Sequence, residues 1–191
     1  MRSGEVGLAV KIKSVIIAGL VLSILLNLYF FHQLNKSSEE AKLAMLGKIH
    51  DGVNYAYNFG ETLQGKYNDI SMKEKAEYIT AMSWSLQLST HTLEILEPND
   101  DRYRELADLF SIYSHISSRD LGNMMSKENI LDEEVLELLD IWLADVKYLD
   151  EKLDYNQLAK RNYTELRAYW ETLISNLKYQ NDGLIQYKQS F

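Results

Sequence analysis

The sequence predicts an all-α protein in which an N-terminal transmembrane helix is followed by an antiparallel bundle of about five helices. Three observations predict this class: residues 14–31 carry no charged side chain, apolar residues recur every three or four positions through most of the later chain, and Pro98 is the single proline. Strand signals are weak, because no Asn-Gly or Asp-Gly turn lies between two runs of alternating polarity.

The uncharged run at residues 14–31 is long enough to cross the hydrocarbon core of a bilayer. Lys11, Lys13 and Lys36 flank it, and their long side chains can reach the lipid headgroups. A cleaved signal peptide would have a shorter apolar region and a small-residue cleavage site, and a buried core helix would not be apolar on every face. The run therefore predicts a permanent anchor, with membrane lipid as its first partner.

The basic residues near the span predict its orientation. Arg2, Lys11 and Lys13 precede it, whereas Lys36 and Lys42 follow it. The side with more basic residues stays in the cytoplasm. We therefore expect three parts: a short cytoplasmic N-terminus at residues 1–13, a transmembrane signal anchor at residues 14–31 and an extracytoplasmic helical-bundle domain at residues 32–191.

The expected domain is strongly acidic. The whole chain carries a net charge of −8, and residues 1–31 contribute +2 through three basic side chains and one acidic one, so residues 32–191 carry −10. Such a domain is a poor partner for nucleic acid and is repelled by anionic lipid. The chain has no cysteine, which excludes disulfides and thiolate metal sites but does not identify a compartment.

Helix boundaries follow from capping residues and helix breakers. Ser71 and Glu74 form a capping box that predicts a helix start near residue 72. Pro98 disfavours helix at the residue before it. Together with the apolar spacing, these signals predict bundle helices at about residues 37–64, 72–97, 100–122, 133–153 and 157–189.

The connection between the anchor and the first bundle helix allows two interpretations. No glycine or proline lies between His32 and Glu40, which favours one continuous helix from about residue 11 to residue 63. Ser37 and Glu40 nevertheless form a second possible capping box, which would mark a new helix. A continuous helix would couple the bundle mechanically to the membrane, whereas a break would make the anchor a simple tether.

Gly52, Ala56 and Gly60 form a small-residue ridge on the first bundle helix, with a spacing of four positions. An interior glycine costs about 1 kcal/mol of helix propensity relative to alanine, so a compensating contact is expected. We interpret the small-residue ridge as a place of close packing against another helix or against a large ring such as that of Trp84, Trp142 or Trp170. The alternative is a small ligand pocket between helices.

The fourth expected bundle helix is highly acidic. Glu133, Glu134, Glu137 and Asp140 lie within two turns of it. The helix dipole accounts for acidic residues in the first turn only. These four residues, the acidic face, form a candidate docking surface for a basic partner. The alternative is a solvated surface that basic residues of the next helix partly neutralise.

Motifs for catalysis and metal binding are absent from the sequence. It contains no His-Glu-x-x-His, no Gly-x-Ser-x-Gly, no phosphate-binding glycine loop and no EF-hand loop. None of His32, His50, His91 and His115 follows a glutamate by three positions, as a di-iron bundle requires. We therefore expect no enzymatic activity, no cofactor and no catalytic, cofactor-binding or metal-binding residues.

The expected function is protein–protein interaction. The chain would be a single-pass, membrane-anchored bundle of the bacterial cell envelope with an accessory or regulatory role towards another membrane or envelope protein. One alternative is an extracytoplasmic ligand-sensing bundle that signals through a partner membrane protein, because no second span follows residue 31. A second alternative is an anchored enzyme without a recognisable motif. The sequence identifies neither the partner nor the oligomeric state.

Overall fold

The structure is a computed structural model that describes the backbone of residues 3–96, 103–127, 130–158 and 161–190. Side chains are described from residue 23 onwards within these ranges, apart from residues 156 and 157. The described residues form helices joined by short connections, without a strand. The prediction of an all-α fold is therefore confirmed.

The chain divides into two compact units, residues 1–41 and residues 42–191. Helix α1 (Ser3–Lys66) continues from one unit into the other. Of the two alternatives for this connection, the structure therefore contains the continuous helix. In the part of the chain that the structure describes, no helix combines the length and the apolar character needed to cross a membrane. The predicted span at residues 14–31 begins among residues whose side chains lie outside this description. It stays a prediction.

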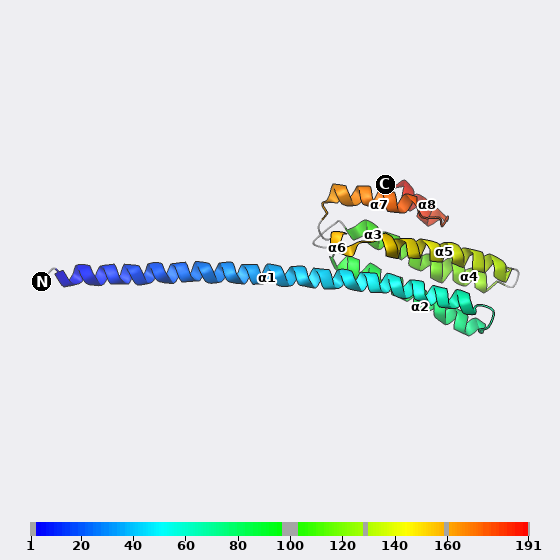
Figure 1. Cartoon of the computed structure of the whole chain (residues 1–191), viewed down its shortest axis with the longest axis horizontal. Helices are drawn as coiled ribbons and strands as arrows, with labels where there is room; N and C mark the ends of the chain where they lie inside the picture. The colour runs from blue at the N-terminus through cyan, green and yellow to red at the C-terminus, as the bar shows by residue number, and fades with distance from the viewer. Residues whose placement is uncertain (1–2, 97–102, 128–129, 159–160, 191) are drawn as a thin grey trace. The chain divides into compact units, whose positions relative to one another are not determined.

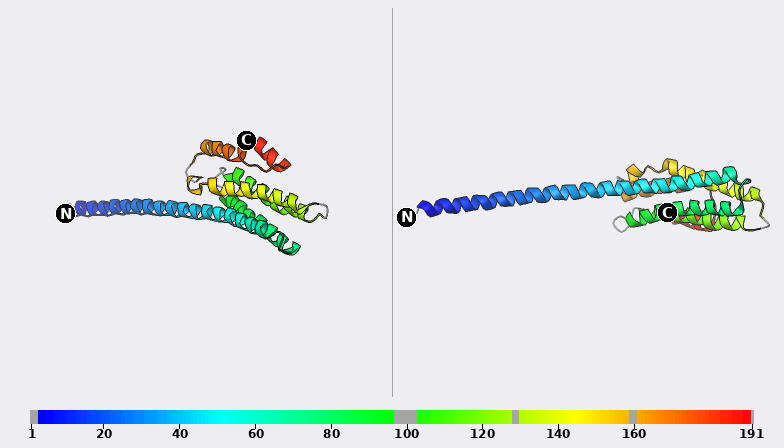
Figure 2. Two further views of the ribbon diagram at one scale, coloured as in Figure 1. Left: turned by 45° about the vertical axis from the view of Figure 1, so that its right-hand side comes forward. Right: turned by 90° about the horizontal axis from the view of Figure 1, so that it is seen from below.

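Residues 42–191 form a helical bundle with an additional C-terminal layer. Figures 1 and 2 show the C-terminal part of α1 beside α2, then α3 beside α5, and then α7 with α8 as the outer layer. The elements after α1 are α2 (Met72–Leu96), α3 (Arg104–His115), the π-helix η3 (Ile116–Leu121), α4 (Gly122–Met125), α5 (Asp132–Lys152), α6 (Tyr155–Leu158), α7 (Tyr163–Ser175) and α8 (Asp182–Gln189).

Helices α1 and α2 pack closely in antiparallel directions. Gly52 of α1 lies against Ser85 and Ser89 of α2, whereas Gly60, two turns later on α1, lies against Met82, which is earlier on α2. The approach is close enough for the Ser89 hydroxyl to donate a hydrogen bond to a backbone carbonyl of α1 at 2.8 Å. Small residues on α1 therefore set the distance between these two helices.

Helix α5 covers the other flank of α1, also in the antiparallel direction. Gln64 of α1 donates a hydrogen bond to Asp140, in the first half of α5. His50, earlier on α1, lies 3.3 Å from the carboxylate of Asp150, near the end of α5. The C-terminal part of α1 is therefore enclosed between α2 and α5.

Alanine in place of Gly52 should destabilise the bundle by about 1–3 kcal/mol, although alanine is the better helix former by about 1 kcal/mol. A Cβ at this position would lie 2.1 Å from the Ser89 hydroxyl oxygen and 2.7 Å from the Ser85 carbonyl oxygen. A backbone oxygen cannot rotate away, so α1 and α2 would have to separate. Urea unfolding of the full chain measures the change.

Gly47→Ala is the matched control, because it makes the same change in the same helix. A Cβ there would meet nothing within 4 Å, so only helix propensity changes and the bundle should gain up to about 1 kcal/mol. If Gly52→Ala stabilised the protein as Gly47→Ala does, the close packing of α1 on α2 would be refuted.

The helical rod that begins with α3 contains a wide turn. Helix α3 continues without interruption into η3 and then α4. Near this widening, the carbonyl oxygen of Tyr113 accepts hydrogen bonds from the Trp142 indole nitrogen and the Ser117 hydroxyl, both at 3.2 Å. Trp142 is fully buried. Its hydrogen bond therefore joins α5 to the widened part of the rod inside the core.

The prediction of a single helix at residues 157–189 is wrong, because the structure has α6, α7 and α8 there. A capping box starts α7: the Asn162 side chain accepts from the Glu165 N–H at 3.0 Å, and the Glu165 carboxylate accepts from the Asn162 N–H at 3.2 Å. Asn181 caps α8 in turn, since its side chain accepts from the N–H of Leu184 at 2.7 Å. Each cap satisfies N–H groups that a continuing helix would have bonded internally.

The other expected boundaries lie close to those of the structure. Helix α2 begins at Met72, as predicted, and α5 begins at Asp132, one residue before its predicted start. The third predicted helix, 100–122, extends to Met125 through η3 and α4, and its predicted start lies outside the described residues.

A buried carboxylate on α5 holds the connection between α7 and α8. Asp145, which is 1% exposed, accepts hydrogen bonds from the backbone N–H groups of Lys178 and Tyr179, each at 2.8 Å. It also accepts from the Tyr113 hydroxyl at 2.6 Å. Burial, and then the charge of Asp145, raise the pKa of Tyr113 well above its ordinary value, so the hydroxyl stays a donor. Asp145 thereby joins α3, α5 and the C-terminal layer.

Candidate interaction surface

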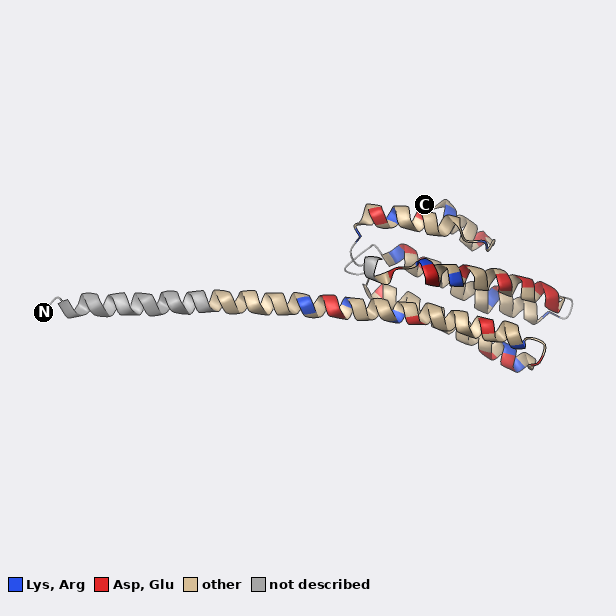
Figure 3. Ribbon diagram, in the orientation of Figure 1, with Lys and Arg blue, Asp and Glu red and all other residues tan. Residues whose placement is uncertain are grey.

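The acidic face lies on the N-terminal half of α5, where Figure 3 shows acidic residues concentrated. Glu133, Glu134 and Glu137 are exposed, and their side chains have no hydrogen bond or ion pair within the described residues. Asp140 is also exposed, but it accepts the hydrogen bond from Gln64 of α1. The structure therefore leaves three of the four predicted docking residues available to solvent and gives the fourth a contact within the bundle.

The small-residue ridge lies inside the bundle. Gly52, Ala56 and Gly60 are all buried. A Cβ at Gly60 would lie 2.9 Å from the Leu143 side chain and 3.0 Å from the Trp142 ring, both on α5. Gly52 faces α2 instead, so the small-residue ridge contacts two different helices.

The outer face of α2 carries a row of large apolar side chains that the bundle does not cover. Trp84, Leu88 and Ile95 are 68%, 51% and 64% exposed. Their spacings of four and seven positions place them on one face of the helix. The opposite face is buried and includes Leu86 and Leu93. Helix α2 is therefore apolar on both sides, although the bundle covers only one of them.

A shallow groove of about 310 Å³ lies between α1 and α2, at the end of this row. Phe59 of α1 and Tyr78 and Ala81 of α2 line it, and Glu74 and Glu77 make it acidic. Hydrogen bonds from the hydroxyl and backbone N–H of Ser71 lower the pKa of Glu74 below its ordinary value, so the groove is negatively charged at neutral pH. The row and the groove together are called the α2 surface.

Sequence reasoning did not identify the α2 surface. The regular apolar spacing along this helix includes Ile79, Leu86 and Leu93, and all three are buried. The missed signal was the presence of large apolar residues at positions outside that spacing, above all Trp84. A helix with one buried face is usually polar on the other, so large apolar residues on both faces indicate a second contact.

Two histidines of the bundle, His50 and His91, lie beside carboxylates. His50 lies beside Asp150, and the ring of His91 lies 2.8 Å from the Glu94 carboxylate. Among the residues that the structure describes, no three His, Asp or Glu side chains are grouped as metal ligands would be.

No protein-family model matches the chain, and neither a curated protein nor a solved structure matches it. The function is therefore inferred from the chain's own surfaces.

Proposed function

We propose that this chain is a single-pass, membrane-anchored helical bundle of the bacterial cell envelope that acts, without catalysis, by binding another membrane or envelope protein through the α2 surface. The observation that carries the proposal is the exposure of Trp84 at the start of a row with Leu88 and Ile95. Tryptophan is among the side chains that most often dominate binding energy, and contiguous exposed apolar surface commonly marks an interaction site.

The sequence supports the anchor and its orientation. Residues 14–31 carry no charge, which suits the hydrocarbon core, and basic residues are more numerous before them than after them. The proposed arrangement therefore has the N-terminus in the cytoplasm and residues 32–191 outside the membrane.

The charge of the α2 surface indicates the chemistry of the partner. Glu74 and Glu77 line the groove, and residues 32–191 carry a net charge of −10. A partner segment with an apolar face and basic residues at one end would bury Trp84 and neutralise these carboxylates. Complementary charge would also accelerate association, and salt would weaken that acceleration.

The proposal is tested with the full chain carrying a photo-crosslinking phenylalanine analogue at position 84. Irradiation of intact cells or spheroplasts should give one discrete product with a membrane or envelope protein. Adding Leu88→Ala and Ile95→Ala should remove this product while changing the stability by no more than about 0.5 kcal/mol, because both side chains are exposed. Protease added from outside should then digest the bundle, as the proposed orientation requires.

The same analogue at Ile185 is the matched control, since this partly exposed side chain lies on α8 rather than on the α2 surface. Identical products from positions 84 and 185 would show non-specific contact and would contradict the proposal. A product that persists in the double variant, or a bundle that external protease cannot reach, would contradict it as well.

A further inference from the structure

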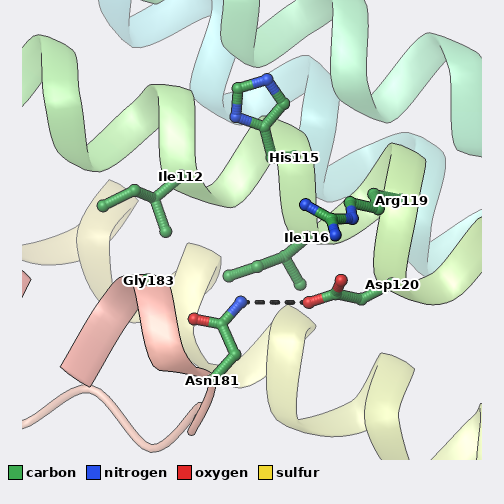
Figure 4. A pocket seen from close by; sticks show the side chains of 7 residues that line it. All are labelled: Ile112, His115, Ile116, Arg119, Asp120, Asn181 and Gly183. Carbon is green, nitrogen blue, oxygen red and sulfur yellow. Dashed lines mark hydrogen bonds between the residues drawn. The ribbon is translucent and has the colours of Figure 1, made fainter. Parts of the chain in front are cut away.

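A cavity of about 270 Å³ lies between the widened rod and the start of α8. Ile112 at the end of α3 and Ile116, Arg119 and Asp120 of η3 line one side of it, as Figure 4 shows. The cavity is slightly smaller than the pockets that ordinarily hold drug-sized ligands, which start at about 300 Å³. Its size therefore suits a small metabolite.

The acidic group of the cavity is held in a fixed position. Oδ2 of Asp120 accepts hydrogen bonds from the Tyr179 hydroxyl at 3.1 Å and from the Asn181 side-chain amide at 3.0 Å. Figure 4 shows the second of these bonds at the edge of the cavity. Both bonds use the same oxygen, which leaves Oδ1 of Asp120 to accept from another donor. A carboxylate held in this way is prepared to receive a cation.

The basic group of the cavity, the Arg119 guanidinium, is available to bind a ligand. Within the described residues, the Arg119 guanidinium makes no hydrogen bond or ion pair. A guanidinium can donate two parallel hydrogen bonds to a carboxylate. Arg119 and Asp120 therefore place one positive and one negative group side by side at the mouth of the cavity (Figure 4).

Two aliphatic side chains line the cavity next to these charges, and the exposed side chain of His115 lines it as well. Figure 4 shows the side chain of Ile116 next to the two charged residues and the side chain of Ile112 beyond it, farther from them. Ile116 is almost completely buried. An aliphatic group of a ligand would leave water on contact with these two side chains, which is favourable.

We propose that this cavity binds a free aliphatic α-amino acid. Its carboxylate would pair with Arg119, its ammonium group with Oδ1 of Asp120, and its side chain would lie on Ile112 and Ile116. A simple anion would be repelled by Asp120, and a simple amine would be repelled by Arg119, so the pair of charges selects a ligand that carries both. The site shares no residue with the α2 surface, so this proposal does not depend on the partner proposed above.

The test is calorimetric titration of the full chain in mild detergent with L-leucine and two analogues. 4-Methylpentanoate lacks the amino group, and 3-methylbutylamine lacks the carboxylate. L-Leucine should bind, and each analogue should bind at least about tenfold more weakly, which corresponds to the loss of one charged contact. Arg119→Gln should weaken L-leucine binding by a similar factor without changing the thermal midpoint of the ligand-free chain, because Arg119 makes no hydrogen bond or ion pair within the described residues.

Arg167→Gln is the control variant, since it removes the same charge from an exposed position on α7 that does not line the cavity. It should bind L-leucine like the unmodified chain. The proposal is overturned if L-leucine gives no binding heat at millimolar concentration, if either analogue binds as tightly as L-leucine, or if the two arginine variants behave alike.

Discussion

Above about pH 10 the bundle should lose stability steeply, because burial keeps five tyrosines protonated in the folded state. Burial is the largest cause in each case. It raises the pKa of Tyr67 to about 12, and it also raises the pKa values of Tyr113, Tyr155, Tyr179 and Tyr187. Nearby carboxylates add to the effect, for example that of Asp145 at Tyr113.

The direction of the effect follows from proton binding. Below about pH 10 the folded and unfolded chains both keep these protons, so the tyrosines give no pH dependence. At higher pH the unfolded chain releases protons that the folded chain retains. Each buried tyrosine then lowers the free energy of unfolding by about 1.4 kcal/mol per pH unit, until its own raised pKa is reached. Circular dichroism and tyrosinate absorbance, followed on the same samples, should show helix loss and buried tyrosinate formation together.

Tyr155→Phe provides the matched control for this titration. The Tyr155 hydroxyl is buried and has no hydrogen-bond partner within the described residues. Removing it should leave stability at neutral pH unchanged or slightly higher, and it should move the alkaline midpoint upwards because one fewer proton is released on unfolding. Complete tyrosinate formation while the helical signal remains intact would refute the explanation by burial.

Asp145→Asn should destabilise the protein by about 2–4 kcal/mol. The carboxylate accepts from two backbone N–H groups and from the Tyr113 hydroxyl. An asparagine has one accepting oxygen and a donating amide, so the amide would face a donor and leave it unpaired in a buried site. Urea unfolding measures the loss, and faster hydrogen exchange at Lys178 and Tyr179 locates it.

Asp140→Asn makes the same change on the same helix at an exposed position. Asp140 accepts a single side-chain hydrogen bond from Gln64, which an asparagine oxygen can also accept. We therefore expect a change of no more than about 0.5 kcal/mol. Equal losses from the two variants would mean that the Asp145 network does not hold the C-terminal layer.

The role of Asp145 could not be predicted from the sequence, because its charge is typical of an exposed residue. Asp145 is one of many acidic residues on its helix, and such a helix face is usually solvated. Asp145 is nevertheless buried. Its partners lie more than thirty positions away along the chain, at Lys178 and Tyr179. A short stretch of sequence contains either the donors or the acceptor of these hydrogen bonds, but not both. The spacing of residues along the chain therefore could not predict the pairing.

The sequence contained some of the signals that divide the last predicted helix. The regular apolar spacing through residues 157–189 favoured one helix, but Asn162 with Glu165 is a capping box, and Asn181 precedes Asp182 and Gly183 at the second start. These local signals compete with periodicity. Periodicity identified Ile79, Leu86 and Leu93 as the core side of α2, but it could not indicate that Trp84 would remain exposed.

The wide turn η3 responds differently to substitutions than to changes in the number of residues. A π-turn inside an α-helix contains one residue more than the α-helical path would need. Deleting one residue from Ile116–Leu121 would let an ordinary α-helical path replace the wide turn and would leave α4 close to its present orientation relative to α3, whereas adding one residue would turn α4 by about 100°. Leu121 and Met125, which are buried now, would then face new surroundings. Substitutions keep the number of residues constant, so the wide turn beside the cavity depends on chain length as much as on composition.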